Sequence, residues 1–106
     1  MNKLDLSVYE ENVWEVTMID GTQLHIKKPT QKQLILLNGY DVKLGEVKTF
    51  EDKIKTLNEV ALFILNNNKE DKKYKVKDLE DMQMDILYAI YFGYGEFVQE
   101  AMSNPN

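Results

Sequence analysis

Polar and apolar residues alternate between positions 13 and 27 in the pattern of a β-hairpin. The stretch VWEVTMIDGTQLHIK places Asp20-Gly21, a dipeptide typical of tight turns, between two runs of β-forming residues. A two-residue loop would pair Ile19 with Thr22 and divide the apolar side chains between both faces. A three-residue loop over 19–21 keeps them on one face, and we predict that register. Its cross-strand pairs are Met18 with Thr22, Val16 with Leu24, and Trp14 with Ile26.

This register has two local consequences. Gly21 takes the last position of the loop, which requires a left-handed backbone that glycine adopts without strain. Glu15 stands opposite His25 on the polar face, which is a favourable pair when the imidazole is charged.

A shorter alternating segment precedes the hairpin. Residues 4–8, LDLSV, alternate apolar with polar side chains, and this pattern predicts a short third strand near the N-terminus. The polar residues 9–12 then form a turn that leads into the hairpin.

The dipeptide Pro29-Thr30 closes the hairpin and opens a first helix. Thr30 and Gln33 have the spacing of a capping box. Asn38-Gly39 is a typical helix stop, so we predict that the helix ends there and resumes as a short turn up to Gly45. Its apolar stripe consists of Leu34, Leu37 and Leu44.

A second helix is predicted from Thr49 to the three asparagines at 66–68. Thr49 and Asp52 have the spacing of an N-terminal cap, and the six apolar residues at 60–65 indicate an end that is buried nearly all round. The lysine-rich segment 67–77 is interpreted as a solvated loop. The regular stripe of this helix consists of Phe50, Ile54, Leu57, Ala61 and Ile64.

The longest apolar-periodic segment is 78–102, which we predict to be one helix that organises the rest of the fold. It carries two apolar stripes, whereas a helix of a two-layer domain needs only one. Gly93 and Gly95 mark a kink, a break or a close helix contact. The first, aliphatic stripe is assigned to the core and consists of Leu79, Met82, Ile86, Ile90, Gly93, Phe97 and Ala101.

The second stripe of this segment is rich in methionine and tyrosine, which suit adaptable binding surfaces. Two interpretations remain open for it, a second face of the core or a surface that binds a protein partner. The residues assigned to this candidate protein-binding surface are Met84, Tyr88, Tyr91, Val98 and Met102.

The residue types leave little room for catalytic chemistry. The chain has no cysteine and one histidine, His25, so a metal site would have to use the acids Asp78, Glu80, Asp81 and Asp85. We interpret these acids as first-turn residues that favour the dipole of the last helix. No phosphate-binding loop or nucleophile elbow is present. We therefore predict no catalytic residue, no cofactor and no metal.

The charge and the apolar run lengths exclude two classes of partner. A net charge of −5 opposes binding to phosphate backbones, so we expect no nucleic-acid partner. No apolar run approaches the length of a membrane span, and the N-terminus lacks the apolar core of a signal peptide. We expect a cytoplasmic protein with no membrane partner.

Strands that come first and helices that follow predict an α+β fold. We predict one domain over 1–106, with a β-hairpin region at 1–28 and a bundle of about three helices at 29–102. Residues 103–106 are expected to form a frayed tail.

The order of the local motifs suggests a family. A strand pair closes on Ile19-Asp20-Gly21-Thr22, the run Ile26-Lys27-Lys28-Pro29-Thr30 leads into helices only, and the last helix is aromatic. In this organisation nearly the whole chain resembles the small tail assembly chaperones of long-tailed, siphovirus-type bacteriophages and prophages.

The resemblance implies a non-enzymatic protein that is not part of the finished virion. Such a protein holds the tape measure protein, keeps it soluble and passes it to the tail tube protein, and a longer form is often made by translational frameshifting. Tape measure proteins offer repeated amphipathic helices, which a helix-binding surface accepts. Self-association is a further expectation.

The alternative is a small acidic phage or mobile-element protein that inhibits a host nucleic-acid-binding enzyme. Such an inhibitor would present a compact acidic patch, for which Glu10-Glu11 and the acids at 78–85 are the candidates. It would bind a basic enzyme in a complex that salt weakens.

Overall fold

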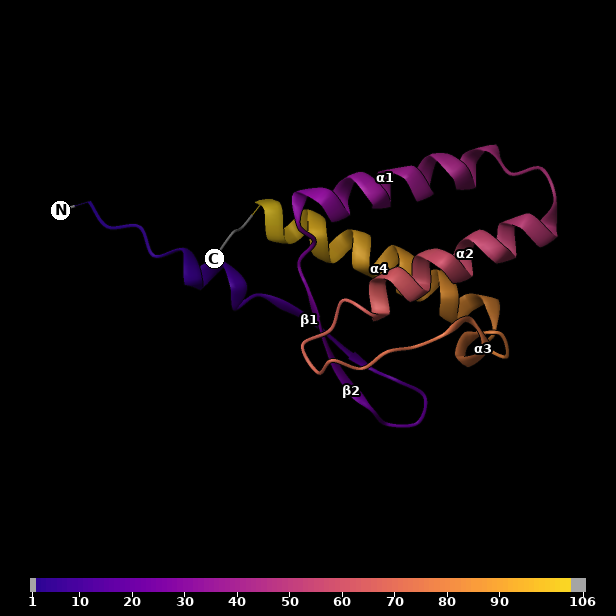
Figure 1. The fold of residues 1–106 in the computed structure, drawn as a ribbon, viewed down its shortest axis with the longest axis horizontal. Coiled ribbons are helices and arrows are strands. Elements are labelled where there is room, and N and C mark those ends of the chain that lie inside the picture. Colours follow the sequence, from indigo (N-terminus) through magenta and orange to yellow (C-terminus); the bar gives the residue numbers. More distant parts are fainter. Residues whose placement is uncertain (1, 104–106) are drawn as a thin grey trace.

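A β-hairpin followed by helices makes up the part of the chain that the computed structural model describes, residues 2–103 (Figure 1). This is the α+β order that the sequence predicts. The predicted tail at 103–106 begins on Ser103, which is the last residue of a helix, and its other residues lie outside the described range. The elements are η1 (Leu6–Glu10), β1 (Val13–Thr17), β2 (Gln23–Lys27), α1 (Gln31–Glu46), α2 (Phe50–Leu65), α3 (Val76–Leu79) and α4 (Met84–Ser103).

The hairpin has the predicted register. Trp14 pairs with Ile26, Val16 with Leu24 and Glu15 with His25. The amide of Met18 donates to the carbonyl of Thr22 at 2.8 Å, which closes the three-residue loop. Gly21 has a φ of +89°, the left-handed conformation that this loop position requires.

The predicted third strand near the N-terminus is wrong. Residues 6–10 form the 3₁₀ helix η1 instead, because Asp5 caps them: its carboxylate accepts from the amide of Ser7 at 3.0 Å and from the Ser7 hydroxyl at 2.6 Å. No residue of η1 is buried. The apolar alternation of this segment therefore serves no sheet within the described chain.

Helix α2 lies at the centre of the fold. The prediction that the last helix organises the fold is therefore wrong. It packs against α1, α3, α4 and β2. Thr49 caps it as predicted, since the Thr49 hydroxyl accepts from the amide of Asp52 at 3.1 Å. Its buried residues are Thr56, Leu57, Val60, Ala61, Ile64 and Leu65, and the core also includes Leu24, Ile26, Leu79, Leu87, Ile90 and Tyr94.

Helix α1 begins as predicted and ends later than predicted. Thr30 and Gln33 form both bonds of the capping box. The stop predicted at Asn38-Gly39 is wrong, because both residues lie on the exposed side and the helix continues to Glu46. The apolar side of α1 packs on α2, and the Tyr40 ring lies 6.1 Å from that of Phe63. No residue of α1 is fully buried.

The segment 78–102 is not one helix. It is divided into α3 and α4 by a turn at 80–83, where the amide of Met82 donates to the carbonyl of Leu79 at 2.9 Å. Leu79 is fully buried against the core, so the chain must turn there to bring α4 back across α2. Asp78 consequently caps α3 by accepting from the amide of Lys75 at 2.7 Å, and it does not lie in the first turn of α4.

The two glycines of α4 leave the helix unbroken, and they differ in surroundings. A Cβ on Gly93 would lie 2.7 Å from Cζ2 of Trp14, whereas a Cβ on Gly95 would meet nothing within 4 Å. Gly93 therefore lets the hairpin tryptophan pack directly on the helix backbone.

We expect the variants Gly93→Ala and Gly95→Ala to differ in sign. Gly95→Ala should raise the free energy of unfolding by roughly 0.5–1 kcal/mol through helix propensity. Gly93→Ala should lower it by about 1 kcal/mol or more, because overpacking against Trp14 exceeds the same gain. Urea unfolding of both variants measures the difference, and equal stabilisation would mean that Trp14 does not pack closely on Gly93.

The three asparagines at 66–68 tie the loop after α2 to the rest of the fold. Asn66 accepts from the Tyr74 amide at 2.7 Å and donates to the Tyr74 carbonyl at 3.0 Å. Asn68, which is buried, donates to the carbonyls of Leu65 and Lys72 and accepts from the Lys72 amide. The segment also forms a bridge between Asn68 and Ile26. It therefore covers the outer edge of β2. The sequence predicts only a helix stop and a solvated loop here.

Candidate protein-binding surfaces

The buried line of α4 combines residues of the first predicted stripe, Ile90 and Ala101, with residues at the boundary of the two stripes. Leu87, Ile90, Tyr94 and Ala101 form that line, and Leu87 and Tyr94 belong to neither stripe. The Tyr94 hydroxyl donates to the carbonyl of Lys27 at 2.8 Å, and burial raises the pKa of Tyr94 to about 12. The first stripe therefore reaches into the core, and the residues of the second stripe lie beside it and are at most partly buried.

The first stripe of α4 faces the hairpin. Ile86, Ile90 and Met82 lie against Trp14 and the rest of β1 around an apolar hollow of about 200 Å³. Phe97 lies farther along, with its ring 6.0 Å from that of Tyr94. The assignment of this stripe to the core agrees with these contacts, although Met82, Ile86 and Phe97 are only half-buried.

The N-terminal half of the second stripe carries a cluster of aromatic rings. The Tyr88 ring is stacked on that of Phe92 at 5.8 Å and 12°, and the Tyr91 ring lies 5.1 Å from Phe92. Lys53 of α2 lies over Tyr88, 5.7 Å from the ring centre. Tyr88, Tyr91 and Phe92 are called the aromatic patch below.

The residues of the aromatic patch differ in exposure. Tyr88 and Tyr91 are half-buried, whereas Phe92 is 60% exposed. The Tyr91 hydroxyl donates to the carboxylate of Asp41 on α1, and partial burial together with this bond raises the pKa of Tyr91 to about 12. Tyr91 thus links α4 to α1, and Phe92 offers the free apolar surface. Phe92 lies on neither predicted stripe, so helical spacing did not select it.

The remaining residues of the second stripe are spread along α4. Met84 is half-buried at the start of the helix. At the other end, Val98 and Met102 line a hollow of about 310 Å³ together with Leu34 and Pro29. Met102 is well exposed, and Val98 packs partly on the core. The structure therefore places the five predicted residues on one side of α4 but at two separate surfaces.

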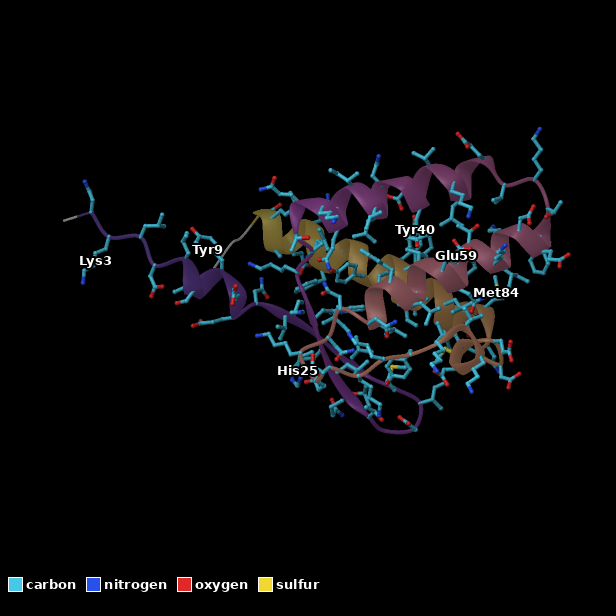
Figure 2. The ribbon with its side chains drawn as sticks, in the orientation of Figure 1. Lys3, Tyr9, His25, Tyr40, Glu59 and Met84 are labelled. Atoms are coloured by element: carbon cyan, nitrogen blue, oxygen red, sulfur yellow. The ribbon has the colours of Figure 1, made fainter. Side chains whose placement is uncertain are left out.

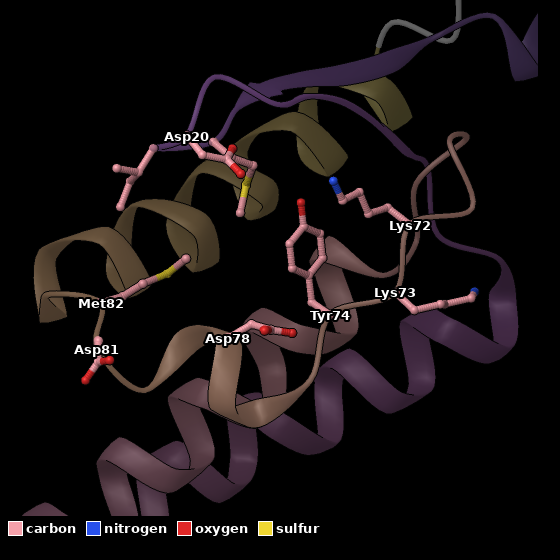
Figure 3. A pocket seen from close by; sticks show the side chains of 9 residues that line it. Asp20, Lys72, Lys73, Tyr74, Asp78, Asp81 and Met82 are labelled. Atoms are coloured by element: carbon pink, nitrogen blue, oxygen red, sulfur yellow. The ribbon is translucent and has the colours of Figure 1, made fainter.

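A larger hollow of about 560 Å³ lies between the hairpin loop, the segment 72–74 and the turn after α3 (Figure 3). Asp20, Asp78 and Asp81 line it, and so do Lys72 and Lys73. Tyr74 also lines it, and partial burial raises its pKa. Both signs of charge are mixed around this hollow, so it is not the compact acidic patch that an inhibitor would present.

Two carboxylates contact the only histidine, His25. Nδ1 of His25 lies 2.6 Å from Oε2 of Glu70, and Nε2 lies 3.8 Å from Oε1 of Glu15. The His25 amide also donates to Glu70 at 2.9 Å, and this bond, followed by the imidazole bond, lowers the pKa of the Glu70 carboxyl. The predicted strand register places Glu15 opposite His25. The contact with Glu70 could not be predicted from neighbouring residues, because Glu70 lies in the loop after α2, far from His25 in the sequence.

Residues 2–103 lack two features that would indicate a metal ion or a membrane as a partner. Among these residues, no group of three or more histidine, cysteine, aspartate or glutamate side chains is arranged to hold a metal ion. No helix in the same range combines the length and the apolar character that crossing a membrane requires.

Comparisons with known proteins leave the function to be argued from the chain itself. Neither a protein-family model, nor a curated protein, nor a solved structure matches this sequence or fold. The surfaces described above are therefore the basis for a functional proposal.

Proposed function

We propose that this protein is a non-enzymatic tail assembly chaperone of a long-tailed bacteriophage or prophage. It would act in the host cytoplasm, bind the tape measure protein and assist assembly of the tail tube. The observation that carries the proposal is the aromatic patch on α4, with Phe92 60% exposed beside stacked Tyr88. The order of hairpin and helices, which resembles that family, supports it further.

The aromatic patch suits a helical partner. Exposed aromatic side chains on a rigid helix provide large apolar contact area at low entropic cost, and they are enriched where proteins bind one another. Lys53 beside Tyr88 adds a positive charge at the edge of the patch. An amphipathic helix of a tape measure protein would place its apolar side on Phe92 and Tyr88, with acidic residues toward Lys53.

The first experiment is affinity capture of the tagged protein from phage-producing cells, with the bound proteins identified by mass spectrometry. Recovery of a very long, helix-rich protein together with a tail tube subunit would support the proposal. Recovery of one basic host enzyme, in a complex that salt dissociates, would favour the inhibitor instead.

We expect Phe92→Asp to weaken capture of the long helical protein at least tenfold. Truncation of a hot-spot aromatic costs about 2 kcal/mol or more, which corresponds to a loss of roughly thirtyfold or more and so exceeds the tenfold threshold. Phe92 is a better choice than Tyr91, because an aspartate at 91 would face Asp41 and disturb the fold. Circular dichroism should show an unchanged fold.

The matched control is Val76→Asp, which introduces the same charge at another exposed apolar position. Val76 is the first residue of α3, where an acid is well tolerated. This variant should bind as the unaltered protein does. Equal capture of the long helical protein by both variants would show that the aromatic patch does not bind it.

A further inference from the structure

The outer edge of β1 is an open sheet edge. In β2, the amide of Lys27 donates to Asn67 and the carbonyl of His25 accepts from Lys69, so both residues point outward from the hairpin. Their partners Val13 and Glu15 point outward on the other side, as does Thr17 two residues on. Within residues 2–103, the backbones of these three β1 residues bond to no further segment.

The two edges of the hairpin are therefore unequal. The segment 67–69 covers the edge of β2, and Glu70 holds the His25 amide. Nothing in the described chain covers β1, and natural proteins seldom leave such an edge unprotected. Its side chains are no barrier to an added strand, since neither a proline nor a lysine lies on it.

An apolar hollow adjoins this open edge. It has a volume of about 200 Å³ and is lined by β1, the start of the hairpin loop, Met82 and α4, without any residue of β2. Trp14 and Val16 of β1 and Met18 just after it form one side, and Ile86, Ala89 and Ile90 form the α4 side. A strand added to β1 would therefore place alternate side chains over the hollow.

The chain itself carries a strand-like segment that has no partner. Residues 4–8 alternate apolar and polar side chains, and Leu4 and Leu6 are 74% and 66% exposed. This arm extends away from the helices, with Lys3 far from the rest of the protein (Figures 1 and 2). Because η1 buries no residue, its single turn can be given up at low cost.

The root of the arm is fixed on the side of β2. Lys69 donates to the carbonyl of Glu10 at 3.1 Å, and Lys28 lies 5.6 Å from the ring centre of Tyr9. The open edge belongs to β1, on the opposite side of the hairpin. The arm is thus directed away from its own β1 edge.

We propose that the arm of one copy of this chain adds to β1 of a second copy as an antiparallel third strand. The antiparallel register that pairs Ser7 with Glu15 and Asp5 with Thr17 brings no like charges together. It uses the outward backbone groups of β1, and it puts three apolar side chains over the hollow. The apolar pairs in this register are Leu4 with Met18, Leu6 with Val16, and Val8 with Trp14.

This contact is head-to-tail. The donor and the acceptor surfaces lie on opposite sides of the hairpin, so each bound pair keeps one free arm and one free edge. Association therefore continues past the dimer unless a ring closes.

Sedimentation velocity of the full chain over a range of concentrations tests the proposal. The average mass should rise with concentration to that of a dimer and beyond, and Leu6→Asp should keep the protein monomeric. Ile35→Asp is the control, because Ile35 is equally exposed but lies on α1, away from the arm and the hollow. It should associate as the unaltered chain does.

Amide hydrogen exchange identifies the edge that is used. The amides of Glu15 and Thr17 should be protected at high concentration, and exchange freely in Leu6→Asp at the same concentration. A chain that stays monomeric throughout, or association that Leu6→Asp leaves intact, would overturn the proposal. So would protection of these amides in the monomer, since the arm would then pair with its own β1.

Discussion

Replacing Leu57 with alanine is expected to lower the free energy of unfolding by about 3 kcal/mol. Leu57 is 1% exposed at the centre of α2, the helix that packs against α1, α3, α4 and β2. Leucine-to-alanine changes in cores cost roughly 2–5 kcal/mol, and the cost is larger where the neighbours cannot move into the space. Leu57 lies where these elements meet in the core, so the cost should fall inside this range.

Urea unfolding followed by circular dichroism measures this loss as a lower midpoint at an unchanged slope. The matched control is Leu36→Ala, the same chemical change on α1, where Leu36 is 49% exposed. That variant should change the free energy of unfolding by less than about 1 kcal/mol. Similar losses in both variants would mean that α2 is not the centre of the core.

Replacing Asn68 with alanine should cost about 2–3 kcal/mol, although the side chain is short and polar. The change leaves the carbonyls of Leu65 and Lys72 and the amide of Lys72 without their side-chain partner. Backbone groups that lose a partner in a buried place cost about 1–3 kcal/mol, and Asn68 is 4% exposed. Exchange of the Lys27 amide should also become faster, because its acceptor Asn67 is held by the same loop.

Asn58→Ala is the control for this prediction. Asn58 lies in α2 and donates to the carbonyl of Ile54, but its buried Oδ1 has no partner within residues 2–103. Its removal takes away an unsatisfied acceptor and adds helix propensity, so the free energy of unfolding should change little or rise. Equal losses for both asparagines would show that the bonds of Asn68 do not hold the loop.

The features that the sequence predicts correctly are local ones. The hairpin register follows from keeping Trp14, Val16 and Met18 on one face, and Gly21 satisfies the loop. Thr30 and Thr49 cap their helices through bonds to residues three positions away. Each of these choices depends on a few neighbouring residues and on nothing else in the fold.

The features that it misses depend on distant partners. The break at 80–83 has no glycine or proline to mark it, and it results from the burial of Leu79 against the core. Asn66 and Asn68 look like helix terminators until the loop they bind is in place. The arm shows the same limit. The alternating pattern of residues 4–8 predicts a strand, but a strand forms only where another strand pairs with it.

The candidate surface was only partly accessible to sequence reasoning for a geometric reason. Helical spacing finds stripes, but two stripes of equal strength do not reveal that the buried line joins Ile90 and Ala101 of the first stripe to Leu87 and Tyr94 at the boundary. The exposed ring of Phe92 falls outside both stripes. The assignment of Met84, Tyr88, Tyr91, Val98 and Met102 to a protein-binding surface stays a prediction.

Helix α1 is joined to the fold by one side only. It packs on α2, buries no residue completely, and exposes Ile35 and Val42 on its outer side. Its detachment would cost the contacts of Leu37, Tyr40 and Leu44 and the bond between Asp41 and Tyr91, but it would expose no fully buried residue of α1. We therefore expect its opening free energy to lie below that of global unfolding. Amides of α1 should therefore exchange with solvent faster than those of α2, without unfolding of the whole chain.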